Sequence, residues 1–137
     1  MGLRLQYVEA RGPADFKRAF AEIAQGRAQA LLVAGSSAYF AYRDELRSFV
    51  TRSRLPTMYT LREMMDAGGL MAYAANLSDF VGRSAVYVDK LLKGANPADL
   101  PVEQPTEFDL VISLRTARSL GLTIPPAVLE RADERIE

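Results

Sequence analysis

The sequence predicts an α/β domain with a Rossmann-like, mostly parallel sheet and helices on both faces. Segments with strand-like and helix-like patterns alternate along the chain of 137 residues, and strict alternation is typical of parallel strands joined by right-handed crossovers. The run QALLVA at 29–34 is continuously apolar, as strands buried on both faces are. The composition, 49% hydrophobic and 25% charged residues, is that of a globular domain.

The predicted strands differ in pattern. Residues 3–9, LRLQYVE, alternate apolar and polar side chains with the period of two that indicates a half-buried strand. The later candidates are short segments, and the clearest of them is the continuous apolar run at 29–34. The predicted strands are residues 3–9, 29–34, 57–60, 70–74 and 107–114.

The segments between these strands predict helices. Pro13 suits the first turn of a helix, and Gly26 is a plausible stop. The clearest helix is 76–93, where apolar residues recur at the helical spacing, with Asn76 or Ser78 as its cap. A proline-rich connector follows at 96–105. The other predicted helices are residues 39–52, 61–67 and 115–121, and a terminal helix beginning at Pro126.

The composition excludes several function classes. The chain contains no Cys, no His and no Trp, so no disulfide, thiolate nucleophile, Ser-His-Asp triad or His-based metal site can form within it. Lys+Arg and Asp+Glu both number 17, giving a net charge of zero, whereas nucleic-acid binders usually carry a basic excess. We therefore expect no catalytic residues, no metal, no cofactor and no nucleic-acid partner.

The first residues do not have the pattern of a signal peptide. MGLRLQYVEARGP has no apolar core and no small-residue cleavage site, so we expect no signal peptide in this chain. No stretch approaches the roughly 20 apolar residues of a membrane span.

Ligands of open α/β sheets bind beyond the carboxyl ends of the strands. This rule points to the loops at 35–40, 59–63 and 73–76. The GSS turn of the first loop offers hydroxyl and backbone N–H groups that could hold a carboxylate or phosphate at a helix start, although a helix cap is the simpler interpretation. The phosphate-binding patterns G-x-G-x-x-G and G-x-x-x-x-G-K-[ST] are both missing from the sequence.

Aromatic and charged residues add to these loops. Aromatic side chains at strand ends suit a wall that stacks on a flat ligand, with core packing as the alternative. Arg62 and Glu63 could pair with an amino-acid zwitterion, or could form an exposed pair at a helix start. The candidate ligand-binding residues are Ser36, Ser37, Tyr39, Phe40, Tyr59, Arg62, Glu63, Tyr73 and Asn76.

Three stretches of the second half carry a family resemblance: YVDKLLKGANPADLPVEQPT, FDLVISLRTARSLGLTIP and ERADERIE. With QALLVAGSSAYF and RLPTMYTLREMMDAGGLMAY upstream, they resemble the ABC-transporter substrate-binding proteins of the tryptophan/tyrosine-binding type. The resemblance covers essentially the whole chain. It implies one lobe of a two-lobed periplasmic-binding-protein type I fold and a small organic ligand, such as an aromatic amino acid, held between the lobes. It also implies a periplasmic receptor that serves an ABC permease and ATPase and is not an enzyme.

The chain departs from the family pattern at several points. Complete members are more than twice as long and begin with a signal peptide and a first lobe. Ala74-Ala75-Asn76 stands where a glycine-containing stretch is typical, and Ser36-Ser37 stands where many members have an acidic residue or proline. These positions belong to the candidate site, so the resemblance leaves the ligand open.

The resemblance also divides the chain. We expect a ligand-binding lobe core at 1–75, a hinge-crossing helix and connector at 76–105, and a returning strand and helices at 106–137. Without a first lobe, the apolar face of helix 76–93 would lose its cover, so we expect a homodimer through this helix. The alternatives are a small doubly wound nucleotide-binding domain or enzyme, and a receiver-type domain, whose acidic cluster the strand ends lack.

Overall fold

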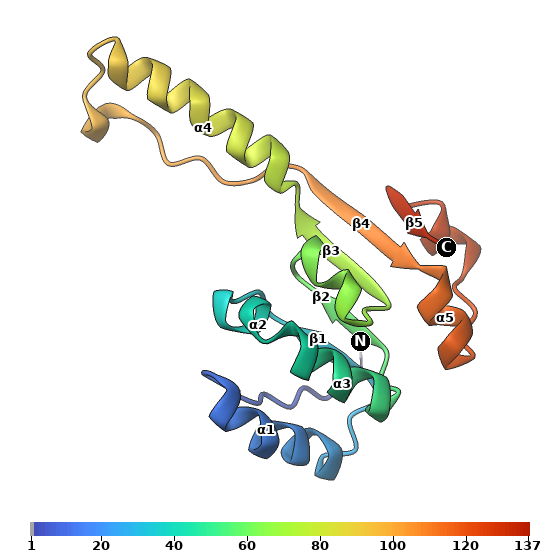
Figure 1. Cartoon of the computed structure of the whole chain (residues 1–137). Helices are drawn as coiled ribbons and strands as arrows, with labels where there is room; N and C mark the ends of the chain where they lie inside the picture. The colour runs from blue at the N-terminus through green and yellow to red at the C-terminus, as the bar shows by residue number, and fades with distance from the viewer. Residues whose placement is uncertain (1) are drawn as a thin grey trace.

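The computed structural model describes residues 2–137, apart from the side chains of Ser37, Ala38 and Phe80. Its centre is a five-stranded sheet in the order β1-β2-β3-β4-β5. The strands are β1 (Leu31–Val33), β2 (Thr57–Tyr59), β3 (Met71–Ala75), β4 (Phe108–Ser113) and β5 (Glu134–Ile136). β3 and β4 pair antiparallel and the other neighbours pair in parallel, which confirms the predicted mostly parallel α/β sheet (Figure 1).

Helical segments connect the strands. They are α1 (Pro13–Gln25), α2 (Ser37–Ala41), α3 (Arg43–Ser53), η1 (Arg62–Ala67), α4 (Leu77–Leu92), η2 (Pro97–Asp99), α5 (Leu114–Leu120) and α6 (Pro126–Leu129), where η1 and η2 are 3-10 helices. No helix in residues 2–137 is both long and apolar enough to cross a membrane.

Local sequence explains where the helices begin and end. Pro13 opens α1, where its missing N–H costs no hydrogen bond. Asn76 caps α4 by accepting the Asp79 N–H at 3.0 Å, as predicted from the sequence. Gly68 ends η1 with φ 84°, a left-handed conformation that glycine adopts without a steric cost.

The core lies between α1, α3, η1 and one face of the sheet. Val33, Tyr59 and Ala72 pair in register across β1, β2 and β3, so their side chains share that face. The rings of Phe20 in α1 and Phe49 in α3 stack with their centroids 3.9 Å apart. The remaining core members are Ile23, Leu46, Val50, Met64, Met65, Ala67 and Val111.

The structure differs from the predicted elements in several places. Residues 3–9 form no strand, although they have the strand pattern. The predicted helix 39–52 is two helices, α2 and α3, which meet at Tyr42. The predicted terminal helix is only the short α6, and residues 134–136, expected in an exposed end, form β5 beside β4.

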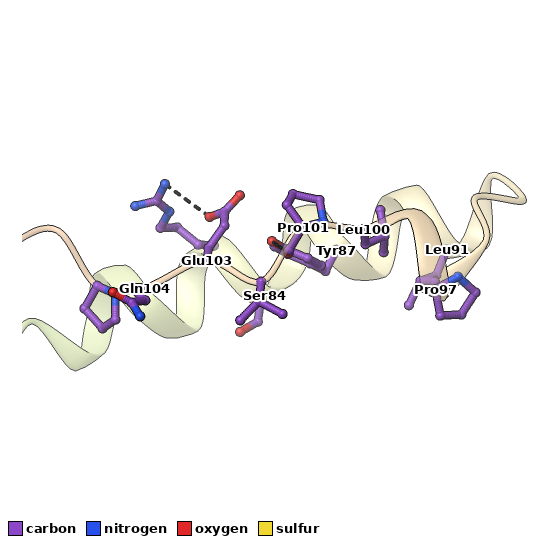
Figure 2. A pocket seen from close by; sticks show the side chains of 11 residues that line it. Ser84, Tyr87, Leu91, Pro97, Leu100, Pro101, Glu103 and Gln104 are labelled. Atoms are coloured by element: carbon purple, nitrogen blue, oxygen red, sulfur yellow. Dashed lines mark hydrogen bonds and ion pairs between the residues drawn. The ribbon is translucent and has the colours of Figure 1, made fainter.

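α4 and the connector after it project away from the sheet as a two-segment arm (Figure 1). The connector runs back along α4 (Figure 2). The Tyr87 hydroxyl donates to the Pro101 carbonyl at 2.6 Å, and Arg83 forms an ion pair with Glu103 at 3.2 Å. Between the two segments lies a groove of about 450 Å³.

Candidate functional site

The carboxyl ends of β1, β2 and β3 meet at one edge of the sheet because these strands are parallel. The loops after β1 and β2 are joined by a hydrogen bond of 2.6 Å from the Gly35 N–H to the Thr60 hydroxyl. Leu61 packs so closely against Gly35 that only glycine fits at this position, since a Cβ would lie 2.7 Å from Cγ of Leu61. The two predicted loops are therefore held side by side.

A polar cluster occupies this edge. The Arg62 Nε donates to Oε2 of Glu134 at 3.0 Å, and the Asn76 Nδ2 donates to Oδ2 of Asp109 at 2.9 Å. The hydrogen bond and the charge of Glu134 raise the pKa of Arg62, and the charges of Glu63 and Asp109 add to this effect. One guanidinium thus faces several carboxylates, from η1, from β4 and from β5.

The first loop contributes an exposed aromatic ring. Phe40 in α2 is 42% exposed, and the Arg43 guanidinium lies 5.5 Å from its ring centroid. Tyr39 is half-buried instead, with its hydroxyl donating to the Ala10 carbonyl at 2.7 Å. Ser36 is half-buried at the start of α2, and the predicted contact of the Ser37 side chain lies outside the described part of the chain.

Two candidates lie away from this cluster. Tyr59 is 1% exposed, and its hydroxyl donates to the Ala67 carbonyl at 3.2 Å, so it is a core residue and not part of a ligand wall. Burial raises the pKa of its phenol. Its side chain faces the core because β2 alternates, with Met58 pointing to the opposite face.

Tyr73 lies on the face of the sheet opposite to Arg62. Its neighbours Ala72 and Ala74 are buried on the core face, so alternation turns Tyr73 the other way. Its ring stacks on that of Phe108 with a centroid distance of 5.4 Å, and the two side chains are 48% and 45% exposed. By contrast Glu134, the partner of Arg62, pairs in register with the buried Val111 of the core face.

The sequence alone did not indicate two participants in the polar cluster, Asp109 and Glu134. Asp109 comes opposite Ala74 only because β4 runs antiparallel to β3, a pairing that the strand pattern does not specify. Glu134 reaches Arg62 only because residues 134–136 form a strand. The one available signal was the long connector 96–105, which allows either direction for the strand that follows it.

A metal site does not explain the cluster. Within residues 2–137 no group of three acidic side chains is arranged to hold a metal ion. The arrangement offers instead a guanidinium, carboxylates, an amide and an aromatic ring. These groups suit the non-covalent binding of a small molecule with charged ends.

Comparison with protein families gives one match. The family model described as ABC transporter substrate binding protein matches residues 1–136. A comparison with curated proteins gave no match.

Several solved structures resemble the chain. A conserved domain protein from Vibrio cholerae is 25% identical, with a TM-score of 0.83 over 92% of this chain and 42% of that chain. An ABC domain from Streptococcus pneumonia, solved in complex with L-Trp, is 24% identical, with a TM-score of 0.89 over 98% of this chain and 46% of that one. A ligand-free, open substrate binding protein with adhesive properties from Clostridium difficile is 15% identical. Its TM-score is 0.62 over 90% of this chain and 41% of that chain. The chain therefore spans less than half the length of each.

Proposed function

The chain belongs to the ABC transporter substrate-binding protein family, and we propose that it forms the carboxyl-terminal lobe of a two-lobed receptor for a small organic molecule. The family is one of solute-binding proteins and not a class of enzymes. A chain that spans 42% and 46% of two similar structures has the size of one lobe. In this proposal 1–75 is the lobe core, 76–105 crosses the hinge, and 106–137 returns to the lobe.

The polar cluster around Arg62 carries the proposal. It lies where open α/β sheets bind ligands. A free amino acid would place its carboxylate against Arg62 and its ammonium against Asp109 or Glu63, because such charge-assisted hydrogen bonds are the strong ones. Asn76 would add an amide. The loop after β1 would complete the half-site with Ser36, Ser37, Tyr39 and Phe40.

An aromatic amino acid is the proposed ligand. The similar Streptococcus protein was solved with L-Trp, and Phe40 offers an exposed ring for stacking. Tyr59 and Tyr73 are left out of the proposed site, the first because it is buried and the second because it lies on the other face of the sheet.

The proposed mechanism is capture without chemistry. The ligand bridges this lobe and a second one, and it shifts a pre-existing equilibrium from open to closed. The closed receptor then delivers the ligand to an ABC permease and its ATPase, in the periplasm.

We also propose that a second copy of the chain covers the arm in a homodimer. Leu77, Val81, Val88 and Leu92 lie on one side of α4 by helical periodicity and are 53%, 63%, 54% and 83% exposed. A contiguous apolar stripe of this kind marks an interaction surface. An isologous contact between two arms would bury the same stripe on both copies.

Equilibrium dialysis against L-Trp tests ligand binding, and the absence of Trp from the chain leaves the ligand as the only indole to be measured. We expect the chain to retain L-Trp, and Arg62→Gln to weaken this about tenfold, as expected for one lost hydrogen bond to a charged group. Arg131→Gln, an exposed arginine in another part of the chain, should behave as the unmodified chain does. Equal retention by all three proteins, or by none, would contradict the proposal.

A further inference from the structure

Asn76 is the first residue after β3, and its side chain forms two hydrogen bonds. Its Oδ1 accepts the Asp79 N–H at 3.0 Å, which caps α4, and its Nδ2 donates to Oδ2 of Asp109 at 2.9 Å. The backbone N–H of Asn76 also donates to the Glu107 carbonyl at 3.3 Å. One residue therefore connects the end of β3, the start of α4 and the start of β4 beside the candidate site.

The capping bond determines where the amide nitrogen of Asn76 points. A carboxamide is planar and carries its acceptor and its donors on opposite arms. The oxygen arm must accept the Asp79 N–H, so the nitrogen arm is left to face Asp109. Serine and aspartate cap helix starts about as well as asparagine does, but neither carries an N–H donor in its side chain. The cap alone therefore does not account for an asparagine at this position.

Asp109 lies on the same face of the sheet as the Arg62 cluster. It pairs in register with Ala74, which is buried on the core face, and side chains of directly opposed residues share a face. The charge of Asp109 contributes to the raised pKa of Arg62. A carboxylate and a guanidinium thus lie near each other, as the ammonium and the carboxylate of an α-amino acid do.

Asp109 has one oxygen that is not engaged by the described residues. Within residues 2–137, Oδ2 accepts the bond from Asn76 and no hydrogen bond reaches Oδ1. An ionised carboxylate offers about four acceptor sites. The bond from Asn76 therefore orders the carboxylate of Asp109 and leaves Oδ1 open to a cationic group.

The other carboxylates of the cluster are less suited to a ligand ammonium. Glu134 is already paired with Arg62. Glu63 is exposed, and no hydrogen bond from the described part of the chain holds its side chain. A side chain that is already ordered loses less conformational entropy when it binds. Asp109 is therefore the better partner for an ammonium group.

We propose that Asn76 is a positioning residue for ligand selection, which holds Asp109 with its Oδ1 open to the ammonium group of the ligand. This role rests on the proposed function and deepens it, because it names the group that the lobe selects: a cationic amine close to a carboxylate. The ammonium binds Asp109 and the carboxylate binds Arg62. Asn76 acts on the ligand through Asp109.

Equilibrium dialysis of the whole chain against three indole ligands tests this role. L-Trp has both charged groups, indolepropionate lacks the ammonium, and tryptamine lacks the carboxylate. We expect Asp109→Asn to weaken the retention of L-Trp and tryptamine about tenfold, as for one lost hydrogen bond between charged groups. It should not weaken the retention of indolepropionate. Glu63→Gln should leave the retention of all three ligands unchanged.

Asn76→Ser keeps a capping oxygen at the start of α4 and removes the donor to Asp109. We expect it to weaken the retention of L-Trp and tryptamine about fivefold, as for one lost hydrogen bond, and to leave that of indolepropionate unchanged. Asn96→Ser is the matched control, because Asn96 caps η2 in the arm by accepting the Ala98 N–H at 3.1 Å. It should retain all three ligands as the unmodified chain does.

Equal weakening of all three ligands by Asn76→Ser would show a merely structural role and would overturn the proposal. Retention of L-Trp that Asp109→Asn leaves unchanged would also overturn it, while the proposed receptor function would stand. Retention of tryptamine without L-Trp, and its loss in Asp109→Asn, would support the role of Asp109 and contradict only the aromatic amino acid as ligand. Retention of neither L-Trp nor tryptamine would overturn both.

Discussion

The Arg62 guanidinium and the Glu134 carboxylate pair across 72 positions of the sequence. The contact connects the start of η1, just after β2, with β5, the last strand. The Arg62 guanidinium, which is the proposed partner of a ligand carboxylate, therefore already has an ion-pair partner within the chain.

We expect Glu134→Gln to separate these two roles of the ion pair. The two side chains are 51% and 41% exposed, and exposed ion pairs contribute only about 0–1 kcal/mol to stability. Urea unfolding should therefore change little, whereas retention of L-Trp should increase because Arg62 is released. Glu130→Gln, on an exposed residue of α6's end, is the control. Weaker retention in Glu134→Gln would show that Glu134 itself assists binding.

Tyr59 makes stability depend on pH in the alkaline range. Burial raises the pKa of its phenol above the usual value of 10.0, so the unfolded chain loses this proton first. The contribution of this phenol to the free energy of unfolding is fully present well below pH 10. It falls as the pH rises above 10, by about 1.4 kcal/mol per pH unit for one proton. We expect Tyr59→Phe to show a smaller fall in urea unfolding between pH 10 and the folded-state pKa. An unchanged slope in this variant would mean that Tyr59 is not the titrating group.

Substitution by alanine is expected to lower the stability of the fold at one glycine and to raise it at another. A Cβ at Gly69 would lie 2.7 Å from Cδ2 of Tyr59 and 3.0 Å from Sδ of Met65, so Gly69→Ala should destabilise by about 1–3 kcal/mol through overpacking. A Cβ at Gly82 in α4 meets nothing within 4 Å, so Gly82→Ala should stabilise by up to about 1 kcal/mol. Urea midpoints measure both. A shift of the same sign in both variants would contradict the packing around Tyr59.

The arm of α4 gives a test of association. Val81 belongs to the exposed stripe, whereas Val86, 51% exposed, lies on another side of the helix by its spacing. In sedimentation equilibrium we expect the unmodified chain and Val86→Lys to be dimers and Val81→Lys to be a monomer. A monomeric unmodified chain would rule out the homodimer, and a dimeric Val81→Lys would place the contact elsewhere.

Much of the fold follows from local pattern, and the rest depends on contacts between distant segments. The apolar runs at 29–34 and 70–74 and the capped helix from Asn76 are local signals, and the structure has strands or a helix at each. Residues 134–136 are too short and too charged to indicate a strand, and they form one only against β4. Residues 3–9 have the pattern, but they pair with no strand of the described residues, and a strand needs a hydrogen-bonded neighbour.

The candidate site was likewise predictable where it depends on local sequence and not where it depends on contacts between distant segments. The rule that ligands bind at the carboxyl ends of parallel strands located the loops that contain Arg62 and Asn76. It could not tell that Tyr59 points into the core, since alternation leaves the choice of face to the packing partner. Asp109 joined the site only through the antiparallel pairing of β4 with β3, which no local signal specifies.

The location of the ligand is the central claim, and amide chemical shifts of the whole chain during a titration with L-Trp test it most directly. The account predicts shifts at residues 35–40, 60–63 and 76, with none at Tyr73 on the other face of the sheet. Shifts confined to the groove along α4, or no shifts at all, would contradict it.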